Sequence, residues 1–214
     1  MNYYVRTTCQ RKLDSSYSQI PYKLLIDKEH KPVDHFIECL FNISNEDSLL
    51  MEDDLILCKD FEIEVGKVVN LYPGKIINFF QSPRRPYPIL DSSSIIFNQC
   101  TYYPKGIGTK IAEIMKTLPR RSGHDKNKYS YLESMALQKL NLTAIIYRPH
   151  LVQHLDLDTL LFEEETTHWR RSLFFIDYLK ELGITYDEVN KHLNELESLK
   201  NKHFSNIKIT DYLL

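Results

Sequence analysis

The sequence predicts an α/β fold in which a mostly parallel sheet is flanked by helices and followed by a helical carboxyl-terminal extension. Two observations lead to this prediction. Short apolar runs of strand length alternate with amphipathic stretches of helical period over residues 1–160, and this alternation is typical of parallel α/β sheets. Three acids, Glu52-Asp53-Asp54, directly follow an apolar run, and ligands of such sheets bind beyond the carboxyl ends of the strands.

The order of the elements follows from these periodicities and from turn residues between them. Strands are expected at 2–8, 22–26, 49–51, 75–80, 93–97 and 144–147. Helices are expected at 32–41, 61–71, 107–118 and 131–140, with a short helix or loop at 11–19. Pro32 suits the first turn of its helix, and Asp60 is a candidate N-cap for the helix that ends before Pro73-Gly74.

The carboxyl-terminal part has a different pattern, with the long, charged, amphipathic stretches 167–182 and 186–203. The second opens with Thr185-Tyr-Asp-Glu188, which fits a capping box. We therefore expect a domain over 1–160 and a helical extension over 161–214, with 155–166 as the linker. These helices are also a candidate surface for homo-oligomers.

Composition narrows the class of protein. The formal charge of -2 gives no global positive field that would favour nucleic acid. The four cysteines are widely spaced and form no zinc motif, which predicts reduced, buried thiols in a cytoplasmic protein. No apolar run approaches the roughly 20 residues of a membrane span, so we expect no transmembrane segment.

The acidic run Glu52-Asp53-Asp54 is the leading candidate for a site. Carboxylates that end a core strand need a partner, and a divalent cation is the simplest one. Mg²⁺ and Mn²⁺ take oxygen ligands, usually one or two carboxylates together with substrate phosphates. The alternative is an exposed turn between two short strands.

Two segments together resemble known enzymes. The run Leu49-Leu-Met-Glu52-Asp53-Asp54-Leu-Ile-Leu, followed later by Tyr147-Arg-Pro149-His-Leu-Val-Gln153-His154, is similar to small glycosyltransferases of the GT-A fold. The similarity includes family-25-type lipopolysaccharide glycosyltransferases and N-acetylglucosaminyltransferase-IV-type enzymes. In these families the acidic motif holds Mn²⁺ or Mg²⁺ against the diphosphate of a nucleotide sugar, and a later histidine lies near the metal.

The resemblance implies a role for several residues. Asp54 becomes the metal ligand and His154 a further protein ligand, while Glu52 or Asp53 holds the ribose hydroxyls or a metal-bound water. The alternative for His154 is an ordinary surface histidine that binds no metal. His150 lies four residues before it, but Pro149 argues against a helix there, so no zinc site is expected.

The resemblance also places the nucleotide near the amino end of the chain. The loop after the first strand would bring Arg6 and Thr7, with Thr8, to the donor base or phosphates. Asp27 would accept a hydrogen bond from the uracil or ribose. Alternatively, the threonines simply end a strand and Asp27-Lys28-Glu29 forms a turn.

A general base is needed if the reaction inverts the anomeric carbon. The resemblance places it before the later histidine segment, where Asp125 and Glu133 are the candidates. Glu133 also completes Ser130-Tyr-Leu-Glu133, a capping-box sequence, and Asp125 lies in a polar loop that suits a solvated carboxylate. The acidic pair of the families is not cleanly reproduced, which leaves the stereochemical outcome open.

Two arginine pairs bear on anionic substrates. Arg84 and Arg85 lie between prolines after a predicted strand, and Arg120 and Arg121 follow a predicted helix. Guanidinium pairs bind phosphate in a bidentate manner, so the first pair is a candidate contact for the donor diphosphate or a phosphorylated acceptor. Solvated surface charge is the alternative for both pairs.

These observations lead to one functional hypothesis with two alternatives. We expect a metal-dependent glycosyltransferase that uses Mn²⁺ or Mg²⁺ and a nucleotide-sugar donor such as a UDP-sugar. Its acceptor is a surface glycan, a protein or a hydroxylated base of phage DNA, and the small size suits a bacterial or phage protein. The alternatives are a catalytically weak nucleotide- or partner-binding module and a metal-dependent nucleotidyltransferase.

Overall fold

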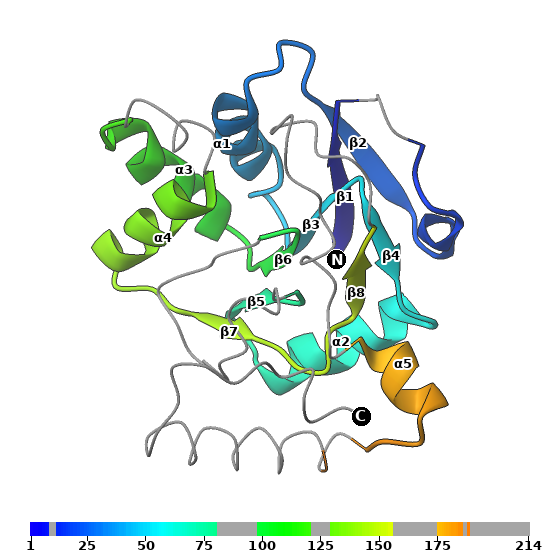
Figure 1. Cartoon of the computed structure of the whole chain (residues 1–214). Coiled ribbons are helices and arrows are strands. Elements are labelled where there is room, and N and C mark those ends of the chain that lie inside the picture. Colours follow the sequence, from blue (N-terminus) through cyan, green and yellow to red (C-terminus); the bar gives the residue numbers. More distant parts are fainter. Residues whose placement is uncertain (9–11, 81–97, 121–128, 156–174, 186–187, 189–214) are drawn as a thin grey trace, which may run out of the picture.

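A six-stranded mixed sheet forms the centre of the protein (Figure 1). The computed structural model describes residues 1–8, 12–80, 98–120, 129–155, 175–185 and 188. The strands of the sheet are β1 (Asn2–Thr7), β2 (Tyr22–Ile26), β3 (Ser48–Glu52), β5 (Ile76–Asn78), β6 (Cys100–Tyr103) and β7 (Ala144–Ile146). Their order is β2-β1-β3-β6-β5-β7, and only β6 runs antiparallel to its neighbours. The predicted mostly parallel α/β fold is therefore confirmed.

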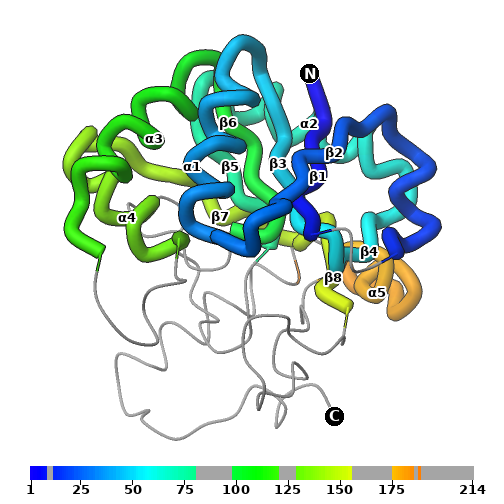
Figure 2. Tube along the Cα trace, turned by 90° about the horizontal axis from the view of Figure 1, so that it is seen from above, coloured from blue at the N-terminus to red at the C-terminus, as the bar shows by residue number. Residues whose placement is uncertain are grey.

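Helices cover both faces of this sheet (Figures 1 and 2). They are α1 (Pro32–Asn42), α2 (Phe61–Leu71), α3 (Ile107–Thr117), α4 (Tyr129–Lys139) and α5 (Ile176–Glu181), together with the short 3-10 helix η1 (Ser15–Gln19). One core cluster combines α1, α3 and α4 with one face of the sheet, and the other combines η1 and α2 with the opposite face.

The central strands are buried on both faces because each face has its own helices. In β3, Leu50 belongs to the cluster under α1, while Leu49 and Met51 belong to the cluster under α2. This arrangement explains the continuous apolar run before the acids, which parallel strands between two helical layers require.

A second sheet was not predicted. It consists of β4 (Leu55–Leu57) and β8 (Val152–His154), which pair antiparallel. Strand β6 was also missed, and the strand expected at 93–97 lies outside the described residues. Strands β4, β6 and β8 have only three or four residues each, too few for a clear alternation of apolar and polar positions.

Two cap predictions have different outcomes. Asp60 precedes α2 as expected, but its backbone is left-handed, with φ of 57°, and its side chain accepts no cap hydrogen bond. The capping box at Thr185 is confirmed, since Thr185 N donates to Glu188 Oε2 at 2.7 Å and Glu188 N donates to Thr185 Oγ1 at 3.3 Å.

Three of the four cysteines, Cys39, Cys58 and Cys100, are free and buried as expected, and Cys9 lies outside the described residues. In the described part of the chain no helix is long and apolar enough to cross a membrane. Helix α5 lies within the predicted extension, most of which is outside the described residues.

Candidate functional site

The acidic run lies in a turn between β3 and β4. Glu52 is the last residue of β3, and Asp53 and Asp54 form the bend before Leu55. The alternative of a turn between two short strands is therefore correct, but the turn is not exposed. Asp53 and Asp54 are only 7% and 4% exposed, so both carboxylates are removed from bulk water and require compensating groups.

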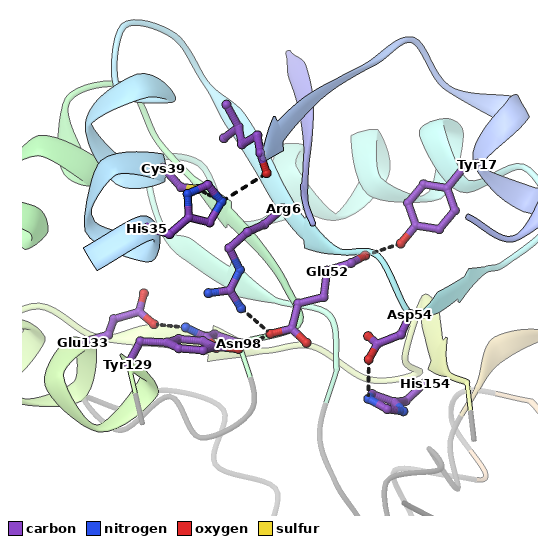
Figure 3. Close-up of polar contacts among 11 residues, drawn as sticks. Arg6, Tyr17, His35, Cys39, Glu52, Asp54, Asn98, Tyr129, Glu133 and His154 are labelled. Carbon is purple, nitrogen blue, oxygen red and sulfur yellow. Dashed lines mark hydrogen bonds and ion pairs between the residues drawn. The ribbon is translucent and has the colours of Figure 1, made fainter. Parts of the chain in front are cut away.

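The pairing of β4 with β8 brings His154 to Asp54. Leu55 is the register partner of His154, and the Leu155 N–H donates to the Asp54 carbonyl at 2.7 Å. As a result, His154 Nε2 lies 3.3 Å from Asp54 Oδ2 (Figure 3). Both side chains are almost completely buried. The two residues expected to share a metal thus meet, although they lie far apart in the sequence.

The donor atoms at this point fit a divalent cation with an incomplete protein shell. Two ligands at about 2.1 Å from one ion and at right angles to each other lie about 3 Å apart, close to the observed 3.3 Å. Among the described residues no group of three or more His, Cys, Asp or Glu side chains could hold a metal. Water and substrate oxygens would occupy the remaining coordination positions of the metal ion. The imidazole ligand favours Mn²⁺ over Mg²⁺.

Asp53 points to the neighbouring strand. The hydroxyl of Thr7, at the end of β1, donates to Asp53 Oδ2 at 2.5 Å. Period-two alternation along an extended chain predicts different directions for Asp53 and Asp54. The hydrogen bond to Thr7 and the proximity of Asp54 to His154 agree with that expectation.

Glu52 is held by Arg6 and Tyr129 (Figure 3). Arg6 Nη2 donates to Glu52 Oε1 at 2.6 Å, and the Tyr129 hydroxyl, from the first residue of α4, donates to the same oxygen. The guanidinium carbon of Arg6 lies 4.0 Å from the centre of the Tyr129 ring. Arg6 and Glu52 were expected to contact the donor nucleotide. In the structure they bind each other and connect β1, β3 and α4.

The 3-10 helix η1 contributes two residues that sequence reasoning missed. The Tyr17 hydroxyl donates to the Glu52 carbonyl, and the Leu57 N–H donates to Ser16 Oγ at 2.9 Å. These bonds fix the chain immediately before and after the acidic turn. The 11–19 segment was identified only as a short helix or loop, and no local sequence signal indicates its contact with the turn.

Asp27 has a local structural role. Its backbone N–H donates to the Thr7 carbonyl at 2.8 Å, and its side chain accepts a hydrogen bond from Lys31 N at 3.1 Å. The first bond continues the β1–β2 ladder, and the second closes the turn between β2 and α1, as the turn alternative predicts. Contact with uracil or ribose stays a prediction.

Glu133 is fully buried on α4. Its carboxylate accepts a hydrogen bond from Asn98 Nδ2 at 2.7 Å (Figure 3) and another from the Tyr103 hydroxyl at 2.6 Å. Burial raises the pKa of Glu133 to about 7, and these two hydrogen bonds partly oppose that shift. The capping-box alternative is wrong, because the helix begins at Tyr129 and the Glu133 side chain bonds to Asn98 and Tyr103.

Three candidates, Asp125, Arg84 and Arg85, lie outside the described residues. Arg120 forms an ion pair with Asp34 at the exposed surface, which agrees with the interpretation of Arg120 as a surface charge.

His150 is buried, and burial lowers its pKa well below the usual value. The Phe80 ring lies 6.0 Å from the His150 ring and 6.2 Å from the His154 ring, between centroids.

No protein-family model and no curated protein matches the chain. Among solved structures, it is similar to one described as a glucose-1-phosphate thymidylyltransferase from Bacillus anthracis in complex with sucrose. The two are 15% identical with a TM-score of 0.36, and the match covers 63% of this chain and 58% of that chain. A second structure, CMP:2-keto-3-deoxy-manno-octonic acid synthetase with CTP, is 10% identical with a TM-score of 0.35, covering 69% and 71%. The chain spans little more than half of the first structure, and likeness this distant identifies no activity.

Proposed function

We propose that this protein is a metal-dependent glycosyltransferase that moves a sugar from a nucleotide-sugar donor to an acceptor hydroxyl. The observation that carries the proposal is the pair Asp54 and His154, whose side chains lie 3.3 Å apart and nearly free of solvent at the end of a core strand. A buried carboxylate beside an imidazole is a donor set for a divalent cation. Its position beyond β3 is where sheets of this type bind ligands.

Asp54 and His154 would hold Mn²⁺ or Mg²⁺, which would supply positive charge to the departing diphosphate. The acceptor oxygen forms a bond to the anomeric carbon, and the bond from that carbon to the diphosphate oxygen breaks. The electron pair leaves with the diphosphate, and the acceptor proton passes to a carboxylate.

Two carboxylates are candidates for this proton. The pKa of Glu133, raised to about 7, suits a base that works near neutral pH. Both of its oxygens, however, already accept hydrogen bonds from Asn98 and Tyr103, and an acceptor hydroxyl would have to replace one of them. Asp125 is therefore the first candidate to test.

The donor nucleotide would lie beyond the ends of β1 and β3. Thr7 and Asp53 bridge these two strand ends through their hydrogen bond, so they are the residues best placed for contact with ribose or phosphate. Arg84 and Arg85 remain proposed contacts for the diphosphate. Because the formal charge is -2, we favour a glycan or protein acceptor over DNA.

A nucleotidyltransferase is the main alternative, and it would need a glycine-rich phosphate loop. The candidate glycines are at 106 and 108. Gly106 N donates to the Ser44 carbonyl at 2.8 Å, and a Cβ on Gly108 would lie 2.5 Å from the Leu40 carbonyl oxygen. These glycines therefore pack α3 against α1 and its following turn, which weakens the alternative.

Turnover of a panel of nucleotide sugars, with Mn²⁺ or with EDTA, tests the proposal. A glycosyltransferase releases a nucleoside diphosphate in the presence of Mn²⁺ only. Pyrophosphate-dependent formation of a nucleoside triphosphate would instead identify a nucleotidyltransferase. Nucleotide binding without either product would identify a binding module, and either of these results would overturn the proposal.

A further inference from the structure

A row of three polar residues crosses the sheet at the carboxyl end of β3. Arg6 of β1 is the register partner of Glu52. On the other side of β3, Glu52 N donates to the Gln99 carbonyl at 2.8 Å, which continues the β3–β6 ladder one residue beyond Met51 and Cys100. Residues directly opposite each other in neighbouring strands share a face of the sheet. The side chains of Arg6, Glu52 and Gln99 therefore lie on one face, which α1 and α4 cover.

Two polar atoms of this row are buried and have no hydrogen-bond partner in the part of the chain that the structure describes. They are Arg6 Nη1, a donor, and Gln99 Oε1, an acceptor. The neighbouring amide of Asn98 is as deeply buried as that of Gln99, both residues being 5% exposed, but it donates to Glu133 Oε2 at 2.7 Å. Buried polar groups normally have partners, because leaving them unpaired destabilises the fold. Arg6 Nη1 and Gln99 Oε1 thus offer a donor and an acceptor to a bound molecule.

The row favours a neutral hydroxyl group as its ligand. The charge of Arg6 is balanced by Glu52, whose Oε1 lies 2.6 Å from Arg6 Nη2, so no net positive charge remains for a phosphate. Gln99 Oε1 would also face the oxygens of a phosphate, which are hydrogen-bond acceptors. A hydroxyl, by contrast, accepts from Arg6 and donates to Gln99. The Glu52 side chain is 15% exposed, so the row borders the solvent from which a ligand enters.

We propose that Arg6 and Gln99 hold a hydroxyl of the sugar carried by the nucleotide donor, and that Gln99 thereby helps to select this sugar. The inference rests on the proposed function, which puts the diphosphate at Asp54 and His154. Thr7, the proposed contact for the nucleotide, lies at the end of β1. Since the nucleoside and the sugar lie on opposite sides of a diphosphate, the sugar extends toward β6, which Gln99 precedes.

The row also lies between the two groups that sugar transfer needs. Figure 3 shows Arg6 and Glu52 between the buried Glu133 carboxylate of α4 and the pair Asp54 and His154. A sugar bound to the row would therefore have the departing diphosphate on one side and a candidate base on the other. Attack on the anomeric carbon requires such an arrangement of the reacting groups.

Thermal unfolding of two amide variants tests whether Gln99 is kept for a ligand. Gln99→Met removes the polar end of an unpaired side chain, so its thermal midpoint should equal or exceed that of the wild type. Asn98→Leu is the matched comparison, because it removes an amide that bonds to Glu133, and it should lower the midpoint by at least about 2 °C. An equal loss of stability in both variants would show that Gln99 is bonded within the fold, which would overturn the proposal.

Titration calorimetry in the presence of Mn²⁺ tests the ligand. The probes are UDP-glucose, UDP-N-acetylglucosamine and GDP-mannose, each compared with its nucleoside diphosphate. Gln99→Met should raise the Kd of the best-bound nucleotide sugar at least about tenfold and leave that of its nucleoside diphosphate unchanged. Gln138→Met is the matched control, since Gln138 is exposed on α4, and it should change neither Kd. An equal rise for the nucleoside diphosphate would assign Gln99 to the nucleoside instead, and no rise for any nucleotide sugar would leave only water at the row. Either result overturns the proposal.

Analogues that each lack one sugar hydroxyl identify the contact. One analogue of the best-bound nucleotide sugar should bind the wild type at least about tenfold more weakly than the parent does. The same analogue should bind Gln99→Met and the wild type equally, because the variant and the analogue remove the same hydrogen bond. An equal effect of Gln99→Met on all analogues would show that no sugar hydroxyl contacts Gln99.

Turnover of the same nucleotide sugars separates this inference from the proposed function. If Gln99→Met weakens binding of the nucleotide sugar alone but the wild type transfers no sugar, the sugar contact stands and the transferase proposal fails. If the wild type transfers sugar and Gln99→Met binds the donor with wild-type affinity, the transferase proposal stands and the sugar contact is wrong.

Discussion

The hydroxyl of Tyr17 donates a hydrogen bond to the backbone carbonyl of Glu52, the residue before the two buried aspartates. Tyr17 is itself 1% exposed, and burial and the nearby acids hold the pKa of its hydroxyl well above the usual value. The hydroxyl therefore stays protonated and keeps its role as donor. Through this bond, η1 fixes the position of the acidic turn from outside the main sheet.

We expect Tyr17→Phe to lower the free energy of unfolding by about 0.5–1.5 kcal/mol, because the part-buried hydrogen bond to the Glu52 carbonyl is lost. The looser turn should also raise the Mn²⁺ concentration needed for half-maximal turnover. Urea denaturation and a Mn²⁺ titration measure the two effects. Tyr178→Phe is the control, since Tyr178 is 48% exposed on α5. Equal stability and equal Mn²⁺ dependence of the two variants would contradict this role of Tyr17.

Glu133 makes the stability of the protein depend on pH. Its pKa is raised from the ordinary 4.5 of a glutamate carboxyl to about 7 in the folded state, so the folded state binds the extra proton between these pH values. The free energy of unfolding should therefore fall as the pH rises from about 4.5 to 7, by on the order of 3 kcal/mol from this residue.

Urea denaturation of the wild type and Glu133→Gln across this pH range isolates the effect. The wild type should lose stability relative to the Gln variant as the pH rises, and the difference should level off above pH 7. A pH-independent difference would show that Glu133 is ionised in the folded protein throughout, contrary to its burial among Asn98 and Tyr103.

Replacement of glycine by alanine should have opposite effects on the free energy of unfolding at two helical positions. A Cβ on Gly108 of α3 would lie 2.5 Å from the Leu40 carbonyl oxygen of α1, whereas nothing lies within 4 Å of a Cβ on Gly66 of α2. Gly108→Ala should lower the free energy of unfolding by about 1–3 kcal/mol through overpacking. Gly66→Ala should raise it by about 0.5–1 kcal/mol. Similar thermal midpoints for the two variants would refute the close α1–α3 approach.

Local patterns were sufficient to predict most of the large elements. Strand β2 and helix α2 have the expected bounds, and α1 buries Val33, Phe36, Ile37 and Leu40 as its period indicates. Strand β6 was missed, and β4 was expected only in the alternative of a turn between two short strands, because a strand of three or four residues carries too little periodicity.

The candidate site was only partly visible in the sequence. The acids were identified from their position after an apolar run and His154 through a resemblance, and the proximity of Asp54 and His154 depends on the β4–β8 pairing. The partners of Arg6 and Glu133 could not be found in the same way, because Glu52, Asn98 and Tyr103 reach them through tertiary contacts between distant segments. The same applies to the bond from Tyr17 to Glu52.

The most direct test of the proposed metal site is Mn²⁺ binding to the folded protein in the presence of UDP, followed by the electron paramagnetic resonance signal of free Mn²⁺. Asp54→Asn removes the charge of the proposed ligand at nearly constant volume, and His154→Ala removes the imidazole. Asp60→Asn is the control, since the Asp60 side chain makes no cap hydrogen bond at the start of α2.

We predict that Asp54→Asn and His154→Ala each raise the Kd for Mn²⁺ at least tenfold, or about 1.4 kcal/mol. Circular dichroism should show an unchanged fold, and Asp60→Asn should bind Mn²⁺ like the wild type. Wild-type Mn²⁺ affinity in a folded Asp54→Asn protein would contradict a metal site at Asp54 and His154.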